Sequence, residues 1–517
     1  MHKEHRRHNS TLVFTMPGYS QLEDYEELTS TYGSLHDNYV SNKWSSKWPI
    51  SALLATGCLI VVGVLLAIVV IERLKNEDGI NSALNTFTTV TCCYETAPDG
   101  HSSIVLVESI PRCVDFGSNV TFGKNLYEAW TDLLSLATKQ IDVASLYWTL
   151  TGEDLNVNSS TDRLGRDILE RFKALPSRNI SVRVVTSIPT LAPNSTDLKT
   201  LKENGIQVRR LNFGHLTEGI LHTTFWIVDG KHIYIGSANM DWRTLTQVKE
   251  LGVVIYNSSS LATDLHKIFQ SYWVTGRNNA SIPDPWPSSY DTGINEERPL
   301  LVNLSGAPSK VYITASPSAF CPDSRTRDLD AILSIIRDAQ RFIHVAVMEF
   351  YPASKFFHRH GYWPVIEKAL KQSAVERNVS VCLLVGCGRD IDPSVWPFLE
   401  SPDALRSPTD NINIEVKVYI IPMANQSHIP NPRVNHNKYM LTDKVAYIGT
   451  SDWSADFNTT AGVGLVVSQD VLHSVLPGNA FHGQLSAVFD RDWNSQYAIP
   501  LDKLNQNHDC LFPKSTP

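Results

Sequence analysis

The chain carries few charges for its length and has no excess of positive ones. Only 19% of its 517 residues are charged, and 45 Lys and Arg stand against 53 Asp and Glu, a net charge of −8 at pH 7. A protein that grips long duplex nucleic acid through its phosphates needs a surplus of Lys and Arg. The composition therefore excludes a general polycationic binder, but not an enzyme that acts on short or single-stranded ends.

Cysteine is also scarce, and the spacing of the eight cysteines fits no zinc pattern. The sequence offers no other convincing group of metal ligands, so we expect no metal and no cofactor. Seven cysteines follow residue 71, and this odd number leaves one thiol free or paired between chains, which keeps a homodimer open. These seven are Cys92, Cys93, Cys113, Cys321, Cys382, Cys387 and Cys510.

Among the apolar stretches, residues 50–71 stand apart. The run ISALLATGCLIVVGVLLAIVVI has no charged residue and is long enough to cross a bilayer of ~30 Å. It follows 49 mostly polar residues, unlike a cleaved signal peptide, and we expect a transmembrane helix. Flanking charges do not orient it, but the Asn-x-Ser/Thr motifs that follow favour a lumenal C-terminal part and a type II protein. They are at Asn119, Asn158, Asn179, Asn194, Asn257, Asn279, Asn303, Asn378, Asn425 and Asn458.

The segments on either side of this run predict an anchor and its sorting. Residues 1–49 lack apolar periodicity and are expected to form a disordered cytosolic tail. The tail holds three Tyr-x-x-Leu patterns, at Tyr19, Tyr25 and Tyr32. Such patterns arise by chance in a Tyr-rich tail, but three together resemble signals that adaptor proteins read on endosomal and lysosomal membrane proteins. We expect transit through the endoplasmic reticulum and Golgi to the lysosome, with residues 72–103 as a stalk.

The remainder of the chain repeats itself. Residues 104–281 and 301–517 each run strand, helix, strand, then a histidine motif and a final helix, with the Pro-rich segment 282–300 as linker. The expected strands are 141–148, 180–187, 342–350 and 379–386, and the expected helices 162–175 and 363–375. The final helices share one apolar stripe: Leu265, Phe269 and Trp273, and Leu485, Phe489 and Trp493. Two α/β halves with covered, parallel or mixed sheets are therefore predicted.

The two histidine motifs are the centre of the functional prediction. One begins at His222 (HTTFWIVDGKHIYIGSANMDW) and the other at His436 (HNKYMLTDKVAYIGTSDWS). A single histidine in a strand is more often structural, but these two are set into the same order of neighbouring elements. Residues two apart on a strand share a face, so Thr224 lies on the face of the first histidine and Lys438 on that of the second. Asp229 and Asp443, seven residues on, fall on the other face and are more plausible as turn or orienting residues.

Two imidazoles, a lysine and neutral donors around one anion-sized space suit the cleavage of a phosphodiester. One neutral histidine can attack phosphorus while the other, protonated, gives its proton to the leaving oxygen. Lysine and hydroxyl groups can stabilise the charge that builds on the phosphoryl oxygens. A phospho-histidine intermediate that needs no metal is therefore predicted.

These residues resemble the phospholipase D superfamily, whose signature is His-x-Lys-x4-Asp followed by Gly-Ser-x-Asn. The stretches YWTLTGED, GSANMDWRTLTQVKELGVVIY, RVNHNKYM and IGTSDWS are similar to its type II membrane branch of endolysosomal enzymes that degrade single-stranded DNA and RNA from the 5′ end. The resemblance covers most of 104–510. It implies two layered α/β/α halves packed around one shared active site, action in an acidic lumen and a part in innate immunity.

The resemblance also implies roles for individual residues. His222 and His436 would be nucleophile and general acid, with His222 favoured as the nucleophile, and Glu250 would orient a histidine. Asp229 and Asp443 belong to the same catalytic motifs. A disulfide between Cys387 and Cys510 is implied as well. The phosphate would be held by Lys438, Thr224, Ser237, Asn239 and Ser451.

Three positions depart from the signature. Thr224 stands where the family has Lys, and Asp452 where the second turn carries Asn. Ser258 and Ser260 replace a cysteine pair, which leaves Cys92 and Cys93 without the partners that the family pattern supplies. Loss of a phosphate-binding cation weakens the strong, charge-assisted hydrogen bonds of such a site. Three functions therefore compete: an exonuclease on single-stranded nucleic acid, a phosphatidyl hydrolase or transferase on lysosomal lipids, and a catalytically impaired membrane glycoprotein that binds without turnover.

Overall fold

The computed structural model describes residues 101–118, 120–188, 195–354, 361–388, 391–423, 429–430, 433–469, 480–504 and 510. The expected cytosolic tail, the apolar run 50–71 and nearly all of the stalk 72–103 lie outside these residues. Cys92, Cys93, Asn119, Asn194 and Asn425 lie outside them as well. No helix within the described ranges is long and apolar enough to cross a membrane.

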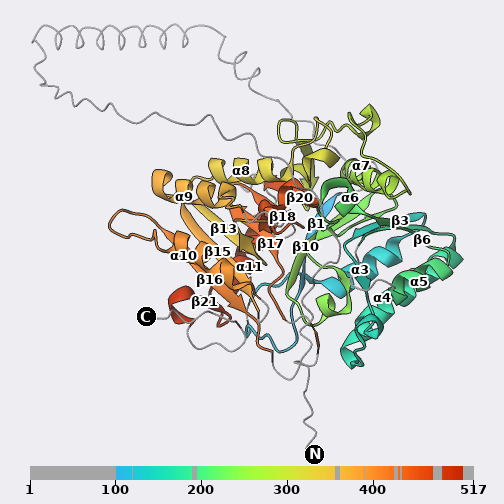
Figure 1. The fold of residues 1–517 in the computed structure, drawn as a ribbon, viewed down its shortest axis with the longest axis horizontal. Coiled ribbons are helices and arrows are strands. Elements are labelled where there is room, and N and C mark those ends of the chain that lie inside the picture. The colour runs from blue at the N-terminus through green and yellow to red at the C-terminus, as the bar shows by residue number, and fades with distance from the viewer. Residues whose placement is uncertain are drawn as a thin grey trace, which may run out of the picture. The chain divides into compact units, whose positions relative to one another are not determined.

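The first half is built on an eight-stranded mixed sheet in the order β2-β1-β10-β8-β7-β3-β5-β6 (Figure 1). β3, β5 and β6 run parallel, whereas β7, β8, β10 and β1 alternate in direction. The strands are β1 (Ser103–Ser109), β2 (Lys124–Asn125), β3 (Gln140–Ser145), β5 (Ser181–Ser187), β6 (Gln207–Leu211), β7 (Phe225–Val228), β8 (His232–Gly236) and β10 (Glu250–Tyr256). The helices are α3 (Leu126–Leu136), α4 (Arg163–Ala174), α5 (Thr196–Glu203), α6 (Phe213–Thr217) and α7 (Ser259–Thr275).

The second half repeats this strand order within a nine-stranded sheet, β11-β12-β20-β18-β17-β13-β15-β16-β21. Its strands are β11 (Leu300–Leu304), β12 (Ala307–Ser316), β13 (Phe342–Val347), β15 (Ser380–Cys387), β16 (Ile414–Ile420), β17 (Lys438–Thr442), β18 (Ala446–Gly449), β20 (Gly462–Gln469) and β21 (Ala498–Pro500). Its helices are α8 (Asp328–Asp338), α9 (Val365–Arg377), α10 (Trp396–Asp403) and α11 (Phe481–Trp493). The repeat seen in the sequence is therefore a repeat of topology.

The expected elements form close to the expected residues. The helices at 162–175 and 363–375 are α4 and α9, and the strands at 180–187 and 379–386 are β5 and β15. The two leading strands, in contrast, end early, at Ser145 and Val347. The chain there leaves the main sheet and forms a two-residue strand, β4 (Trp148–Thr149) or β14 (Phe350–Tyr351). These short strands pair in parallel with β9 (Met240–Asp241) and β19 (Trp453–Ser454), which follow the Gly/Ser turns of the two motifs.

The two halves share a central core. One cluster of buried side chains joins the inner faces of both sheets and includes the stripes of α7 and α11, with Leu265, Phe269, Leu485 and Phe489 nearly inaccessible. A second cluster lies under α3, α4 and α5, and a third under α8, α9 and α10. Each sheet is thus covered on both faces, as the apolar strands predict. Because β8 packs against β18, the histidine-bearing hairpins of the two halves are brought together.

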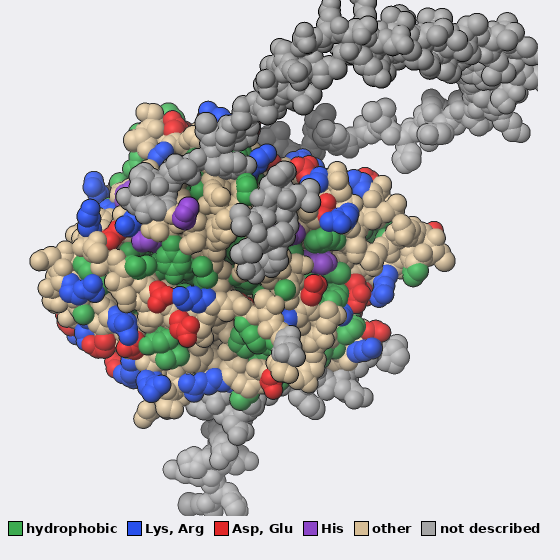
Figure 2. All heavy atoms as spheres, turned by 180° about the vertical axis from the view of Figure 1, so that it is seen from behind, with side chains coloured by type: hydrophobic (Ala, Val, Ile, Leu, Met, Phe, Trp, Pro, Cys, Tyr) green, Lys and Arg blue, Asp and Glu red, His purple; other side chains and the backbone are tan. Residues whose placement is uncertain are grey.

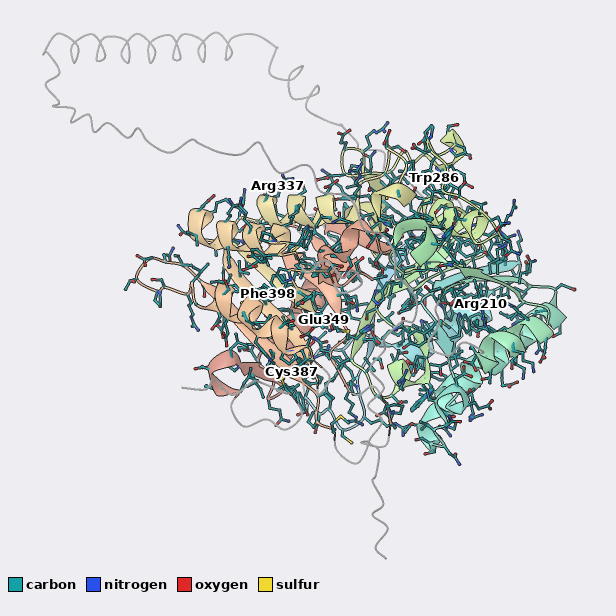
Figure 3. All side chains as sticks on the ribbon, viewed as in Figure 1. Arg210, Trp286, Arg337, Glu349, Cys387 and Phe398 are labelled. Atoms are coloured by element: carbon teal, nitrogen blue, oxygen red, sulfur yellow. A yellow bond between two sulfur atoms is a disulfide. The ribbon has the colours of Figure 1, made fainter. Side chains whose placement is uncertain are left out.

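Covalent and boundary features also follow the sequence. Cys387 and Cys510 form a disulfide, which confirms the pairing implied by the family resemblance (Cys387 is labelled in Figure 3). Residues 282–300 hold a single 3-10 turn, Ser288–Tyr290, before β11 begins. Trp286 of this segment donates its indole N–H to the Ala319 carbonyl at 2.9 Å. Asn158, Asn179, Asn279, Asn303, Asn378 and Asn458 are exposed, where a glycan can be carried, and Asn257 is partly exposed.

Candidate active site

Each candidate histidine lies on the segment that enters the central hairpin of its half. The His436 backbone N–H donates to the Lys249 carbonyl at 2.8 Å, and the Lys249 N–H donates to Val434 at 3.0 Å. In the mirrored position the Ala461 N–H donates to Ile220, two residues before His222, at 2.9 Å. The strand that closes one half therefore holds the histidine segment of the other. This exchange brings the two motifs into one site.

Glu250 fixes the orientation of His436. Its Oε2 lies 2.8 Å from Nδ1 of His436, and the same oxygen accepts a hydrogen bond from the Ser237 hydroxyl at 2.5 Å. Glu250 is 1% exposed and His436 8% exposed, so water competes little for this contact. The carboxylate accepts the Nδ1 proton and leaves Nε2 as the nitrogen that can meet a substrate. The predicted orienting role thus has a structural counterpart, across the boundary between the halves.

Lys438 and His222 converge on Asp452. The Lys438 ammonium lies 3.2 Å from Oδ1 of Asp452, and Nε2 of His222 lies 3.8 Å from Oδ2 of the same carboxylate. The Lys438 side chain is fully buried, whereas those of His222 and Asp452 are 14% and 15% exposed. The carboxylate therefore sits between the lysine and the histidine that a phosphate would contact. Protein atoms supply an anion in part of the space expected for a substrate anion.

The matching positions of the first half carry no charge. Thr224 is buried, at 2% exposure, and its carbonyl accepts the Gly236 N–H at 3.3 Å. Asn239 occupies the position that Asp452 has in the second half. Its carbonyl accepts a hydrogen bond from the Thr244 hydroxyl at 3.1 Å, which stabilises the turn. The first half thus has a threonine and an amide at the positions where the second half has a lysine and a carboxylate.

Two of the predicted phosphate ligands have their hydroxyl groups engaged elsewhere. Ser237 donates to Glu250 and accepts the Leu251 N–H at 3.1 Å. Ser451 donates to Asp328 Oδ2 at 3.1 Å, at the buried start of α8. Burial raises the pKa of Asp328 despite hydrogen bonds from Thr314, Tyr447 and Ser451. In this structure both serines hold the walls of the site, and neither hydroxyl is free to meet a phosphate.

The aspartates of the two motifs lie in the turns at the far ends of β7 and β17. Asp229 accepts hydrogen bonds from the backbone N–H groups of Thr138, Lys139 and Gln140 at 2.8–2.9 Å. Burial opposes its ionisation, but these bonds and the Thr138 hydroxyl outweigh burial and lower the pKa of Asp229. Asp443 accepts from Gln340 and Arg341 in the same way. The structure thus does not bring Asp229 and Asp443, grouped with the catalytic residues above, to the histidine pair, because their turns lie at the opposite ends of β7 and β17 from the histidines.

Comparison with known proteins agrees with this geometry. Residues 117–424 match the family model described as PLD3/4, PLD-like domain. The chain belongs to this PLD3/4 family. The 5′-3′ exonuclease PLD4 of Homo sapiens is 49% identical over 410 residues, which cover 79% of this chain and 81% of that protein. The 5′-3′ exonuclease PLD3 of Xenopus tropicalis is 42% identical over 461 residues, which cover 88% of this chain and 93% of that protein.

Solved structures show weaker likeness. A phosphatidylserine synthase of Haemophilus influenzae is 12% identical, with a TM-score of 0.49 over 72% of this chain and 85% of that one. The phospholipase D family member Nuc of Salmonella typhimurium is 20% identical, with a TM-score of 0.26 over 34% of this chain and 97% of that one. These likenesses are too weak to bear on function.

A buried charge cluster behind the PLD-like site was not foreseen from the sequence. Lys249, fully buried, lies 2.7 Å from Asp492, and Arg491 pairs with both Asp492 and Glu108 at 2.7 Å. Coulombic attraction to these carboxylates outweighs burial and raises the pKa of Arg491. Lys249 also carries the backbone bond to His436, so the cluster anchors the strand that positions Glu250. Glu108 and Arg491 lie 383 residues apart in the chain, and a local sign of the cluster is a charged pair, Lys249-Glu250, at the start of the buried strand β10.

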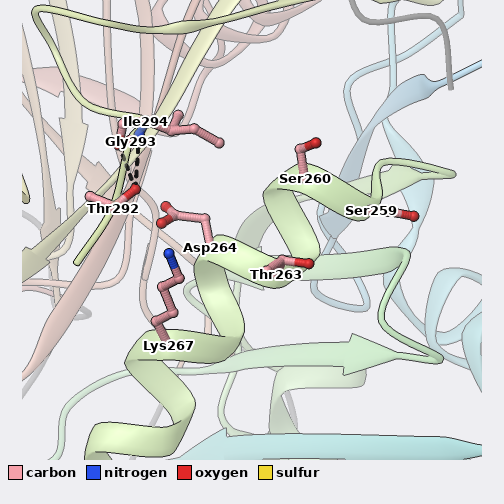
Figure 4. Close-up of a pocket in the computed structure, with 8 residues that line it drawn as sticks. All are labelled: Ser259, Ser260, Thr263, Asp264, Lys267, Thr292, Gly293 and Ile294. Atoms are coloured by element: carbon pink, nitrogen blue, oxygen red, sulfur yellow. Dashed lines mark hydrogen bonds between the residues drawn. The ribbon is translucent and has the colours of Figure 1, made fainter. Parts of the chain in front are cut away.

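A surface hollow of about 320 Å³ lies away from the histidines, beside the N-terminal part of α7 (Figure 4). Its lining residues are Ser259, Ser260, Thr263, Asp264, Lys267, Thr292, Gly293 and Ile294. Asp264 is already paired with Arg325 at 2.7 Å, and no histidine lines the hollow. We therefore assign the site to the histidine pair. Within the described ranges, no three His, Cys, Asp or Glu side chains are grouped as metal ligands.

Proposed function

We propose that this PLD3/4 family member is a 5′-3′ exonuclease that hydrolyses phosphodiester bonds in single-stranded DNA and RNA. The observation that carries the proposal is the pair of histidines from two halves, one held by Glu250 at 2.8 Å and the other beside buried Lys438 and Asp452. The relatives named 5′-3′ exonuclease supply the substrate class and the direction. Lys, Arg, Asp and Glu are intermingled on the face in Figure 2, as suits short, single-stranded substrates better than long duplexes.

The proposed mechanism has two steps. In the first, a nitrogen of His222 bonds to phosphorus, the bond from phosphorus to the leaving oxygen breaks, and His436 gives its proton to that oxygen. In the second, water attacks the phospho-histidine while His436 takes back a proton, and His222 is released. The Glu250 carboxylate stabilises protonated His436, which favours this residue as the acid. Lys438 and the Asn239 amide are the groups proposed to hold the phosphoryl oxygens, with a smaller contribution from the Thr224 hydroxyl.

We also propose that the enzyme is a type II membrane protein of endosomes and lysosomes. The uncharged run 50–71, the ten glycosylation motifs that follow it and the three Tyr-x-x-Leu patterns of the tail support this location. Six of those motifs have exposed asparagines, and the one disulfide among the described residues suits an oxidising lumen. Protease protection of microsomes containing the full chain tests the orientation. A cytosolic C-terminal part would contradict it.

The activity is tested with full-length protein and single-stranded oligonucleotides labelled at either the 5′ or the 3′ end. At a pH of about 5, where histidines are largely protonated, and with a chelator present, we expect mononucleotides to be released from the 5′ end. His436→Ala is the matched control and should release none. No turnover by folded, glycosylated protein would contradict the exonuclease and favour the impaired-binder alternative. Turnover of phosphatidyl lipids alone would favour the lipid enzyme.

A further inference from the structure

The charge of this site is lower than the family signature predicts. The signature places Lys and Asn in both halves, whereas here one half has Thr224 with Asn239 and the other has Lys438 with Asp452. When Asp452 is ionised, each of these pairs is neutral. A phosphodiester, which carries one negative charge, would then meet a carboxylate beside Lys438, the one lysine that stands two residues after a motif histidine. A site with this arrangement attracts its substrate poorly.

We propose that Asp452 binds the substrate phosphate as a neutral carboxylic acid, donating its O–H to a phosphoryl oxygen. In this form Asp452 does the work of the Asn239 amide on the opposite side of the site. The Lys438 ammonium, 3.2 Å from Oδ1, is then released to pair with the phosphate. The inference deepens the proposed phosphodiesterase function and rests on it.

Neighbouring groups act on Asp452 in opposite directions. Lys438 and, when protonated, His222 favour the carboxylate. In the parallel pair β14–β19, Phe350 lies beside Trp453, so the preceding residues, Glu349 and Asp452, are neighbours (Glu349 is labelled in Figure 3). The negative charge of Glu349 opposes ionisation of Asp452. An incoming phosphate adds a second negative charge beside the carboxylate, so binding shifts Asp452 toward its neutral form.

The proton has a defined source and destination. Where His222 is an imidazolium, its Nε2 proton can move over the 3.8 Å to Oδ2 of Asp452 when the phosphate arrives. This transfer leaves the number of protons unchanged and turns His222 into the neutral form that can attack phosphorus. Where His222 is already neutral, Asp452 takes its proton from solvent, and binding consumes one proton. Affinity should then fall as pH rises, by up to about tenfold per pH unit.

The test measures binding by full-length protein in which His436→Ala prevents turnover. The probe is a 3′-fluorescein single-stranded oligothymidylate, titrated between about pH 4.5 and 7.5, the interval in which carboxyl and imidazole groups titrate. The second variant adds Asp452→Asn, which keeps the shape and removes the charge. The matched control adds Asp410→Asn at an exposed position. We expect the Asp452→Asn protein to lose up to one proton from the pH dependence and to bind at least tenfold more tightly than the parent at the highest pH. Asp410→Asn should match the parent.

Two results would overturn the inference. One is an unchanged pH dependence in the Asp452→Asn protein, and the other is weaker binding than the parent at the highest pH, which would mean that the carboxylate itself is required. A second probe, bis(4-nitrophenyl) phosphate, separates this inference from the exonuclease proposal. Proton-linked, Asp452-dependent binding of this diester without binding of the oligonucleotide would support the inference and contradict the exonuclease. Binding of neither probe at any pH would contradict both.

Discussion

The two halves of the molecule have the same strand order but supply different chemistry to their common site. The first half supplies Glu250, which holds the histidine of the second half. Gly462 stands at the mirrored position, and a Cβ atom there would lie 1.8 Å from the Ser451 hydroxyl, so the second half has no room for a returning carboxylate. The carboxylate near His222 is instead that of Asp452, which lies in the turn after β18. Its Oδ2 lies 3.8 Å from Nε2 of His222. Duplication has kept the backbone scaffold, while the side chains have become complementary.

The difference teaches that the backbone bonds and the side-chain roles are separable. Lys249 and Ala461 make equivalent backbone bonds to the two histidine segments, although only Lys249 has a side chain that reaches the buried charge cluster. The scaffold therefore needs only strand geometry at these positions. The chemistry depends on which half carries each charge, and substitutions that exchange or equalise the charges test this division.

The largest effect is expected from the histidines themselves. His222→Ala and His436→Ala should each lower kcat/KM by at least about 1,000-fold, because each removes one of the two groups that the proposed reaction needs. The double variant should be scarcely worse than either single one, since the two act as a unit. The measurement is the rate at which each variant degrades a single-stranded oligonucleotide from its 5′ end. Multiplicative losses would mean that the histidines work independently and that the shared site is wrong.

In the first half, Asp197 is expected to change the free energy of unfolding by about 2–4 kcal/mol between acidic and neutral pH. Burial raises the pKa of Asp197 to about 7, with Asp154 and Glu153 adding to the shift. A raised carboxyl pKa stabilises the fold fully below about pH 4, and this stability is lost as pH rises toward 7. Asp197→Asn should therefore raise Tm at neutral pH and leave it almost unchanged at pH 4, while the amide still accepts the Leu150 N–H. Glu203→Gln, at an exposed position of the same half, is the control. An equal gain at both pH values would contradict the assignment.

Most of the fold and the centre of the site were predictable from the sequence, because both depend on local pattern. Apolar periodicity located α4, α9, β5 and β15, and the matched motifs located the histidines. The partners of these residues were harder to foresee. That Glu250 holds His436, and that Lys438 pairs with Asp452, depends on how two sheets stack across a central core. The hydroxyl of Ser451 was assigned to phosphate because nothing local reveals buried Asp328, 123 residues away.

A charge restored to the first half should raise activity by about tenfold. Thr224→Lys adds a cation opposite Asn239, so a phosphate gains a partner that is not already paired with a carboxylate. The gain should be greatest near neutral pH, where the histidines carry less charge. Thr224→Met introduces a side chain that is similar in size to lysine but uncharged. It therefore separates the effect of charge from the strain of filling a buried position. Equal activities for the Lys and Met variants would mean that the site obtains its positive charge elsewhere.

The smallest effect is expected in the second half, and it has the opposite sign to that of Asp197. His344 of β13 stacks on Phe489 at 4.3 Å, and burial lowers the pKa of His344 to about 4. A lowered histidine pKa gives stability that is complete above about 6.5 and is lost as pH falls, so acidification costs about 1 kcal/mol near pH 5 once partial exposure is allowed for. His344→Phe keeps the stacking and removes the titration. Its Tm should match the parent at pH 7.5 and exceed it by about 1 °C at pH 5. A constant offset at every pH would mean that packing, and not protonation, distinguishes the two side chains.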